Sequence, residues 1–191
     1  MAKIFITGGN GQLGRACKRF FSKNHQVVST DIQEMDITNS DSILKAIGDF
    51  KPDYIVNCAA YTAVDRAESE PDLAYRLNVV GPSKLAAAAV LFKARLIHIS
   101  TDYVFDGERQ YPFPWTEEDE ANPKTVYGRT KLDGERVVLN TFGCDAIVLR
   151  AAWLYSPTGH NFLKTMLRLA ATSTADSVHK IVNDQYGCPT S

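Results

Sequence analysis

Short, almost entirely apolar runs alternate along the chain with longer segments of mixed polarity. The runs are rich in β-branched and aromatic residues and end in glycine, proline or acidic residues, which is typical of buried strands. We expect five such strands, at residues 3–9, 26–31, 53–60, 94–100 and 145–153. Strands that are apolar on both faces indicate a parallel sheet with helices on both sides.

The segments between the strands carry apolar residues three or four positions apart, which is the spacing of one helix face. One such segment begins at an N-cap, Asn39 or Ser40, and stops at Pro52. A longer one contains Gly81 and Pro82, which could bend it. The expected helices cover residues 11–24, 39–52, 71–93, 125–142 and 161–171.

Strands and helices that alternate in this way predict an α/β fold with a Rossmann-type doubly wound parallel sheet. The crossovers between parallel strands should be right-handed. Residues 101–124 contain three prolines and mixed charges, so we expect a loop there. Residues 179–191 are expected to be extended and turn-like.

The composition is that of a soluble globular protein. Of 191 residues, 45% are hydrophobic and 23% are charged, and 21 Lys and Arg balance 22 Asp and Glu. Without a basic surplus or a run of Lys and Arg, we expect no nucleic-acid or membrane partner. The apolar run at the N-terminus is too short for a signal peptide, and no apolar stretch approaches the length of a membrane span.

The chain has four cysteines, Cys17, Cys58, Cys144 and Cys188. No two of them form a C-x-x-C pair, and none has histidines at the spacing of metal ligands. We therefore expect free thiols in a reducing cytoplasm, and no metal site.

A glycine-rich turn, TGGNGQLG, follows the first strand and opens the first helix. Gly8 and Gly11 would let the backbone turn sharply and approach a diphosphate, and Gly14 would let the helix pack closely on the strand. The helix N-terminus offers free N–H groups and a partial positive charge to phosphates. Such a turn can also be purely structural, but its place in the first strand–helix unit favours a dinucleotide site.

Asp31 ends the second predicted strand, about 20 residues after Gly8, where a carboxylate can bind the adenosine ribose. It favours NAD over NADP, because a 2′-phosphate would meet a negative charge. Arg15 and Lys18 lie close in sequence and could soften that preference. We therefore expect NADPH or NADH as the cofactor.

Two further segments lie where such a cofactor would sit. Residues 35–37 follow the second strand and could flank the adenine, although Ile37 could equally cap the core. Ala59 and Ala60 follow the third strand and are small enough for a cofactor, or simply a helix, to lie close.

The candidate reacting groups come from two more segments. Ser100 and Thr101 end the fourth strand at the same sheet edge, where a hydroxyl could bind a substrate carbonyl; such residues are more often caps. In TVYGRTKLDGE, Tyr127 and Lys131 are one helical turn apart. A nearby ammonium favours a phenolate and lowers its pKa from about 10. The pair alone usually marks a helix surface, but the glycine turn and the strand-end hydroxyls favour catalysis.

These motifs, in this order, resemble the extended short-chain dehydrogenase/reductase family. Longer blocks resemble its dTDP-4-dehydrorhamnose reductases: VNCAAYTAVDRAESEP, STDYVFDG, VYGRTKLDGE, LRAAW and VNDQYGCPT. With the first strand and its glycine turn, the resemblance runs from residue 3 to the C-terminus. The resemblance implies hydride transfer from NADPH or NADH to C4 of dTDP-4-dehydro-L-rhamnose, which gives dTDP-L-rhamnose for polysaccharide biosynthesis. It implies a dTDP-sugar as the ligand, and it leaves a homodimer open.

The resemblance also implies roles for individual positions. The cofactor would be bound by Gly8, Gly11, Gln12, Leu13, Asp31, Asp36, Ile37, Ala59, Ala60, Tyr61, Thr62, Tyr127 and Lys131. The catalytic residues would be Thr101, Tyr127 and Lys131. The sugar would be held by Thr101, Asp102, Tyr103, Tyr127 and Trp153.

Two departures from related patterns bear on the reaction. Related sugar-nucleotide 4,6-dehydratases carry Thr-Asp-Glu at the end of the fourth strand, whereas this chain has Tyr103 in the third position, which favours simple reduction. Ala152 stands where these reductases often have a hydroxyl residue, just before Trp153.

Two other functions stay open at this point. The β-subunit of methionine adenosyltransferase resembles these reductases and serves a partner enzyme, and a reductase or epimerase could act on another sugar nucleotide. The intact Thr101, Tyr127, Lys131 and Trp153 favour the enzyme. Because the family's proteins are longer, we expect residues 1–152 to form an NAD(P)-binding Rossmann domain and residues 153–191 to begin a truncated substrate-binding region.

Overall fold

The computed structural model describes residues 1–110, 112–142, 145–174 and 177–191. In them, one sheet is formed by β1 (Lys3–Thr7), β2 (Gln26–Ser29), β3 (Tyr54–Asn57), β4 (Arg95–Thr101) and β5 (Ala146–Ala151). The strands lie in the order β2-β1-β3-β4-β5, and all neighbours are parallel. The predicted doubly wound parallel sheet is therefore confirmed.

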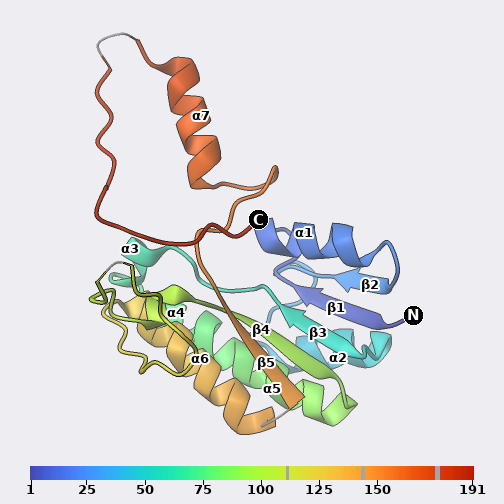
Figure 1. Ribbon diagram of the computed structural model, residues 1–191. Coiled ribbons are helices and arrows are strands. Elements are labelled where there is room, and N and C mark those ends of the chain that lie inside the picture. Colours follow the sequence, from blue (N-terminus) through green and yellow to red (C-terminus); the bar gives the residue numbers. More distant parts are fainter. Residues whose placement is uncertain (111, 143–144, 175–176) are drawn as a thin grey trace.

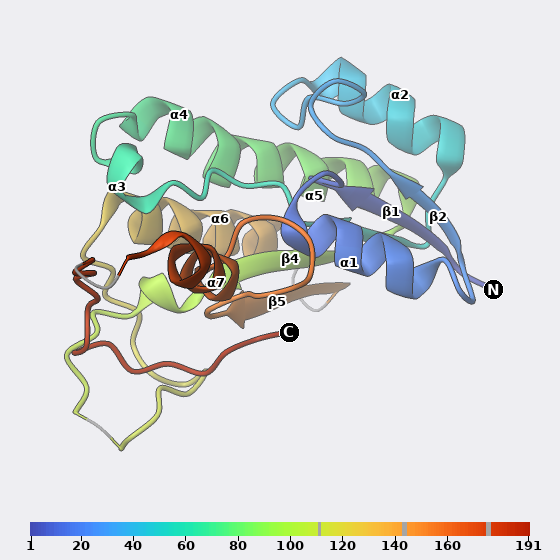
Figure 2. The ribbon, with the colours of Figure 1, turned by 90° about the horizontal axis from the view of Figure 1, so that it is seen from above.

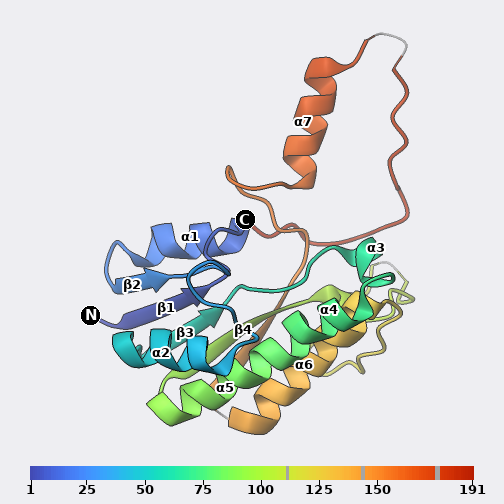
Figure 3. The same ribbon diagram turned by 180° about the vertical axis from the view of Figure 1, so that it is seen from behind.

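Helices cover the two faces of the sheet unequally (Figure 1). One face carries α1 (Gln12–Phe21), and the other carries α2 (Ser40–Phe50), α5 (Gly81–Phe92) and α6 (Val126–Phe142) (Figure 3). The last helix, α7 (Phe162–Thr172), projects away from the sheet. The order in which successive strands are added to the sheet reverses between β1 and β3, and open α/β sheets bind ligands outside the carboxyl ends of the strands at such a point.

The main core lies between the sheet and the three-helix layer. Phe5, Ile55 and Leu96 come from neighbouring strands, are fully buried and point to this layer. Ile47 of α2 and Leu85 of α5 pack against them and are equally buried. The alternating strand residues face α1 instead, where Ile4, Ile6 and Val56 form a smaller cluster. The alternation explains why the central strands are apolar along their whole length.

The helix expected over residues 71–93 is interrupted by a π-helical turn. It consists of α4 (Pro71–Tyr75), the π turn η1 (Arg76–Val80) and α5, which continue as one rod beside α6 (Figure 2). The chain does not bend at Gly81 and Pro82. Gly81 lies against Ile37 instead, because a Cβ there would come within 2.6 Å of Cδ1 of Ile37 and that side chain would have to move.

The π turn presents Asn78, which is fully buried, toward two other segments. Its amide donates to the carbonyl oxygen of Tyr61 (3.2 Å) and to the hydroxyl of Thr130 (3.0 Å). Its Oδ1 accepts from the Tyr61 N–H (2.9 Å). Asn78 therefore fixes the segment after β3 against α6. A short helix in that segment, α3 (Val64–Ala67), was not predicted.

The region expected to be a loop after β4 begins with a 3₁₀ turn, η2 (Asp102–Val104). Beyond it, Phe105 and Trp115 stack with ring centroids 4.7 Å apart. The guanidinium of Arg150 lies over Phe105 and that of Arg109 over Trp115, at 5.0 and 4.2 Å from the ring centroids. Cation–π and stacking contacts thus hold this proline-rich loop to β5.

In the described part of the chain, none of the helices has the length and hydrophobicity that crossing a membrane requires. Cys17, Cys58 and Cys188 are free thiols, as expected. Cys144 lies outside the described residues.

Candidate active site

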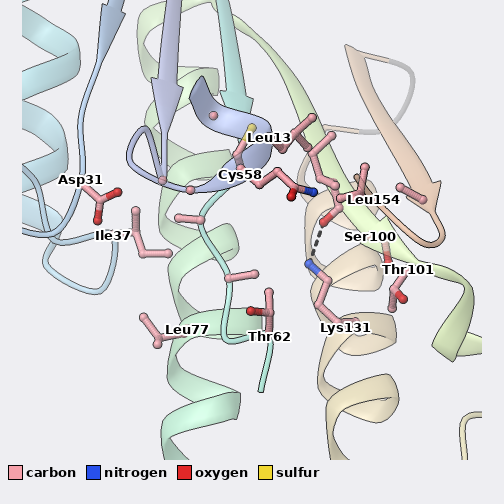
Figure 4. A pocket seen from close by; sticks show the side chains of 18 of the residues that line it. Leu13, Asp31, Ile37, Cys58, Thr62, Leu77, Ser100, Thr101, Lys131 and Leu154 are labelled. Carbon is pink, nitrogen blue, oxygen red and sulfur yellow. Dashed lines mark hydrogen bonds between the residues drawn. The ribbon is translucent and has the colours of Figure 1, made fainter. Parts of the chain in front are cut away.

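A cavity of about 640 Å³ lies at the carboxyl edge of the sheet (Figure 4). It is bordered by the turn between β1 and α1, the segment after β2, the ends of β3 and β4, one face of α6 and the segment after β5. Thirteen of the predicted site residues line it, namely Gly8, Gly11, Gln12, Leu13, Asp31, Asp36, Ile37, Ala59, Ala60, Thr62, Thr101, Tyr127 and Lys131. Residues far apart in sequence therefore meet at the edge that the motifs predicted.

The glycine turn fits a dinucleotide diphosphate. Gly8 has φ +64°, and a Cβ there would lie 2.6 Å from the backbone nitrogen of Ala59. A Cβ on Gly14 would lie 2.3 Å from the carbonyl oxygen of Gly8. Gly11 is the N-cap of α1 and supplies no side-chain acceptor, so the first N–H groups of the helix have no side-chain cap. This open helix end beside a backbone without side chains suits a phosphate.

Asp31 connects the glycine turn to the segment after β2. β2 ends at Ser29, so Asp31 lies just beyond the strand and not at its last residue. One carboxylate oxygen accepts the N–H of Asn10 and the other that of Ile32, both at 2.9 Å. Each oxygen keeps a lone pair for a ribose hydroxyl. Arg15 is not among the described residues that line the cavity, and neither is Lys18.

The segment of residues 35–37 borders the cavity and also contributes to the core. The Asp36 carboxylate accepts from the N–H and the hydroxyl of Thr38, at 2.7 and 2.8 Å, which holds the turn. Ile37 lines the cavity and also packs in the main core.

Thr101 and Tyr127 meet where β4 ends and α6 begins. Both line the cavity, and the Thr101 hydroxyl lies close enough to the phenol to favour a lower pKa of Tyr127. That hydroxyl also donates to the Asp102 carboxylate (3.1 Å) and accepts from the Tyr103 N–H (3.2 Å). Gly128 makes the approach possible, because a Cβ there would lie 2.2 Å from the carbonyl oxygen of Tyr103.

Lys131 is only 2% exposed, and its ammonium donates to the carbonyl oxygen of Ile99 at 2.6 Å (Figure 4). Burial lowers the pKa of Lys131 to about 8, and the charge of Glu135, one turn further along α6, opposes that shift. Glu135 is itself buried and accepts two hydrogen bonds from the guanidinium of Arg150, at 3.0 and 2.7 Å. A buried ion pair thus lies behind the lysine.

Burial raises the pKa of Tyr127, and the nearby Thr101 hydroxyl opposes that shift. Lys131 is not among the groups that shift the pKa of Tyr127, contrary to expectation, and its ammonium donates to the Ile99 carbonyl instead. The phenol is therefore protonated at neutral pH, which suits a proton donor better than a base.

A polar chain crosses the sheet beneath the cavity. The hydroxyl of Thr7 donates to Asn57 (2.6 Å), and the amide of Asn57 bonds to Nδ1 of His98 (3.0 Å). Burial and the nearby Lys131 lower the pKa of His98 to about 3, so its ring is neutral. These bonds link Thr7 and Asn57, the last residues of β1 and β3, to His98 in the middle of β4.

Tyr61 does not line the cavity, contrary to expectation. It packs beside Tyr127, but its phenol donates to the carboxylate of Glu70 at 2.6 Å. That hydrogen bond raises the pKa of Tyr61 and lowers that of Glu70. Its neighbours Ala60 and Thr62 face the cavity.

The other three residues expected to hold the sugar also lie outside the cavity lining. Asp102 and Tyr103 turn into η2, where Tyr103 packs edge-on against Tyr127 with ring centroids 5.6 Å apart. Burial raises the pKa of Asp102. Trp153 has φ +47°, is half exposed and accepts the N–H of Thr190 at its carbonyl. The chain turns at Trp153, two residues after the end of β5, and the indole does not line the cavity.

Seven lining residues carried no prediction, namely Ile32, Cys58, Leu77, Ile99, Ala151, Leu154 and His160. Cys58, Ile99 and Ala151 lie at or just beyond strand ends, so the strand-edge rule could have identified them. Leu77 comes from the π turn, and Leu154 and His160 come from irregular chain, where the sequence pattern gives no signal.

The described residues include no group of three or more His, Cys, Asp or Glu arranged to hold a metal ion.

Comparison with known proteins agrees with this geometry. The sequence pattern of the family described as the RmlD substrate binding domain matches residues 2–191. A dTDP-4-dehydrorhamnose reductase of Aggregatibacter actinomycetemcomitans is 44% identical over 192 residues, which cover 100% of this chain and 63% of that protein. One from Mycolicibacterium smegmatis is 44% identical over 98% of this chain and 56% of its own length.

Solved structures resemble the fold equally well. The dTDP-4-dehydrorhamnose reductase of Clostridium acetobutylicum is 49% identical, with a TM-score of 0.84 over 89% of this chain and 60% of its own. That of Bacillus anthracis, solved in complex with NADP, is 38% identical, with a TM-score of 0.86 over 90% of this chain and 60% of its own. This chain thus spans about 60% of these relatives. Since the family pattern covers it almost from end to end, the chain belongs to the family of the RmlD substrate binding domain.

Proposed function

We propose that this chain supplies the dinucleotide-binding part and the proton-donating groups of a reductase that converts dTDP-4-dehydro-L-rhamnose into dTDP-L-rhamnose. The observation that carries the proposal is one cavity bordered by the glycine turn at one end and by Thr101, Tyr127 and Lys131 at the other. Relatives that are 44% identical over almost the whole chain bear the name of this reductase. A reductase of this kind would serve the biosynthesis of rhamnose-containing polysaccharides.

The residues present fit NADPH or NADH. The glycine turn with Gln12 and Leu13 would hold the diphosphate, Asp31 the adenosine ribose, and Asp36 and Ile37 the adenine. Ala60 would lie against the nicotinamide. The carboxylate of Asp31 favours NADH, whereas the Bacillus anthracis relative was solved with NADP. Dissociation constants for both reduced nucleotides test this choice.

When bound, the reduced nicotinamide would supply a hydride to C4 of the sugar. Tyr127 would then donate its proton to the C4 oxygen as negative charge develops there. Thr101 would form a hydrogen bond with the same oxygen and stabilise that charge. Lys131 would keep a positive charge beside the site below about pH 8.

The residue after Asp102 supports reduction over dehydration. Elimination of water needs a further acid at this strand end, and here Tyr103 packs its ring on Tyr127 instead. There are two alternatives, a regulatory subunit and an enzyme that acts on another sugar nucleotide. An activity assay of the full-length protein distinguishes them from the reductase.

We also propose that residues 153–191 begin the region that holds the substrate. Leu154 and His160 line the cavity, and the amide of Asn161 donates to the side chain of Gln12 at 2.9 Å. These contacts support a segment that closes the cavity beside the glycine turn. Free Cys17, Cys58 and Cys188 support a cytoplasmic location.

The test is an assay of the full-length protein that contains this chain, with dTDP-4-dehydro-L-rhamnose and either NADPH or NADH. The nicotinamide absorbance should fall, and dTDP-L-rhamnose should accumulate in equal amount. Dinucleotide binding without any oxidation would contradict the reductase and favour the regulatory subunit. Turnover with a different dTDP- or UDP-sugar only would replace the proposed substrate.

A further inference from the structure

The segment between β5 and α7 lies against the start of α1 (Figure 2). The amide of Asn161 donates to Oε1 of Gln12, the first residue of α1, at 2.9 Å. Gly159 has φ +77°, and a Cβ there would lie 3.0 Å from Cβ of Gln12. Residues 156–161, which we call the clasp, therefore touch the helix that follows the glycine turn.

Hydrogen bonds hold the clasp in shape. The amide of Asn161 also donates to the carbonyl oxygen of Ser156 at 2.9 Å, which closes the segment into a loop. The ammonium of Lys164, in the first turn of α7, donates to the carbonyl oxygens of Pro157 and Gly159, at 3.2 and 3.0 Å. Oδ1 of Asn161 caps α7 by accepting the Lys164 N–H at 3.0 Å. The clasp and the start of α7 therefore form one unit.

The clasp brings His160 to the cavity. His160 lies in sequence between the two residues that touch Gln12, and it lines the cavity together with the glycine turn. The other ionisable side chains among the described lining residues are Asp31, Asp36, Cys58, Tyr127 and Lys131. Of these, Lys131 carries a positive charge, and its ammonium donates to the Ile99 carbonyl on β4. Within the described lining, His160 is thus the one side chain beside the glycine turn that can gain a positive charge.

A dinucleotide diphosphate would add two negative charges to a cavity that already contains the carboxyl groups of Asp31 and Asp36. The open end of α1 offers about half a positive charge, so most of the diphosphate charge is left unbalanced. An imidazolium adds one full positive charge and donates an N–H to a phosphate oxygen. Such charge-assisted hydrogen bonds are about twice as strong as neutral ones. His160 therefore lies where the diphosphate needs a positive group.

We propose that His160 binds the diphosphate of the dinucleotide through its imidazolium, and that the clasp holds it beside the glycine turn. This role rests on the proposed function, because it adds a residue to the same cofactor site. Affinity for the diphosphate should fall as the pH rises, because an imidazole loses its charge between pH 5 and 8. Below about pH 8, Lys131 keeps its charge and the buried Tyr127 its proton. Lys164 contacts the clasp through backbone carbonyl oxygens.

The probe is ADP-ribose, which carries the diphosphate and lacks the nicotinamide. Its dissociation constant is measured by calorimetry with the full-length protein at pH 5.5 and pH 7.5. His160→Gln should raise this constant about fivefold at pH 5.5, equivalent to about 1 kcal/mol, as for an ion pair open to solvent. At pH 7.5 the same variant should raise it less than about twofold.

His160→Lys keeps a positive charge at both pH values. It should bind ADP-ribose like the parent at pH 5.5 and more tightly than the parent at pH 7.5. His179→Gln, which changes an exposed histidine outside the cavity lining, is the matched control and should leave both constants unchanged.

Two results would overturn the role of His160. One is equal affinity of the parent and His160→Gln for ADP-ribose at pH 5.5. The other is a loss of affinity that is the same at both pH values and that His160→Lys does not restore, since the residue then acts through packing and not through its charge.

The clasp is tested with Asn161→Ser. A serine still caps α7, but it has no amide to donate to Gln12 and Ser156. ADP-ribose should bind at pH 5.5 about as weakly as it does to His160→Gln. The double variant should bind no more weakly than either single one, because both changes act through the same imidazolium. Parent affinity in Asn161→Ser, or additive losses in the double variant, would contradict the clasp.

These measurements separate the role of His160 from the proposed function. If the parent oxidises NADPH with its substrate while His160→Gln binds ADP-ribose as the parent does, only the role of His160 fails. If the parent binds none of ADP-ribose, NADPH and NADH, the dinucleotide site fails, and the proposed function fails with it.

Discussion

Tyr127 is a buried phenol whose pKa is raised by burial and which lines the cavity together with Thr101. Tyr127→Phe removes only the phenol hydroxyl, so dinucleotide affinity should stay within about twofold while kcat falls by about 10²–10⁴. Tyr75→Phe, on the exposed part of α4, is the matched control and should leave kcat unchanged. Steady-state kinetics and NADPH titration of the full-length protein measure both quantities. Unchanged kcat in the Tyr127 variant would exclude it as the proton donor.

The buried charge of Lys131 should destabilise the folded state at neutral pH. Its pKa is about 8 in the fold against 10.5 ordinarily, so between these values the unfolded chain binds more protons. The penalty is full below pH 8 and disappears as the pH rises toward 10.5. Lys131→Met removes this penalty but also loses the hydrogen bond to Ile99, which contributes about 1 kcal/mol. The variant should therefore have a free energy of unfolding at pH 7 that is higher by roughly 2 kcal/mol.

Urea unfolding at pH 7 and pH 10 tests this sign. The advantage of Lys131→Met should shrink at the higher pH, whereas Lys45→Met, on the exposed face of α2, should show no pH-dependent difference. A variant that is less stable than the parent at both pH values would refute the penalty.

Residue types and spacing were enough to predict that Gly8, Asp31, Thr101, Tyr127 and Lys131 border one cavity. They did not predict which partner each polar group would choose. The phenol of Tyr61 binds Glu70, and the ammonium of Lys131 binds a strand carbonyl. Such choices depend on distances between segments that are far apart in sequence.

Among the elements, the π turn η1 joins the segment after β3 to α6 through Asn78. Asn78→Ala removes three hydrogen bonds from a fully buried position, which leaves the Tyr61 backbone groups without these partners. The free energy of unfolding should fall by roughly 1–3 kcal/mol. Asn140→Ala, exposed on α6, should change it by less than about 0.5 kcal/mol. Equal stability of the two variants in urea would contradict this role.

Gly128 sets how closely α6 approaches η2. An added Cβ would lie 2.2 Å from the Tyr103 carbonyl oxygen, so Gly128→Ala must push the Tyr127 end of the helix away from Thr101. We expect kcat to fall at least about tenfold, since displacement of a reacting group by about 1 Å can cost 10²-fold. Gly48→Ala, a helix glycine in α2 that meets only the ring tip of Phe92, is the control. Comparable kcat values in both variants would contradict the packing argument.

Apolar periodicity predicted every strand and the long helices because burial on one face repeats along each of them. It missed α3 because four residues are too few to display a period. It missed the π turn because a single widened turn leaves the apolar spacing nearly unchanged. Strand ends differed by a few residues because pairing, and not composition, decides where a ladder stops.

The molecule as a whole is an open parallel sheet whose carboxyl edge gathers the site, with α7 and the chain beyond it extending from that edge (Figure 1). The parallel sheet with helices on both faces followed from the alternation of elements along the sequence. The position of residues 153–191 did not, because few of their side chains are buried in the described chain. Since relatives are longer, activity belongs to the full-length protein.

The most direct test of the central claim follows the hydride itself. The full-length protein is given dTDP-4-dehydro-L-rhamnose and NADPH carrying deuterium at both C4 positions of the nicotinamide, and the product is read by NMR. We predict one deuterium at C4 of dTDP-L-rhamnose in the wild type and nearly none formed in the same time by Tyr127→Phe. A product without deuterium at C4, or wild-type labelling by the variant, would contradict the account.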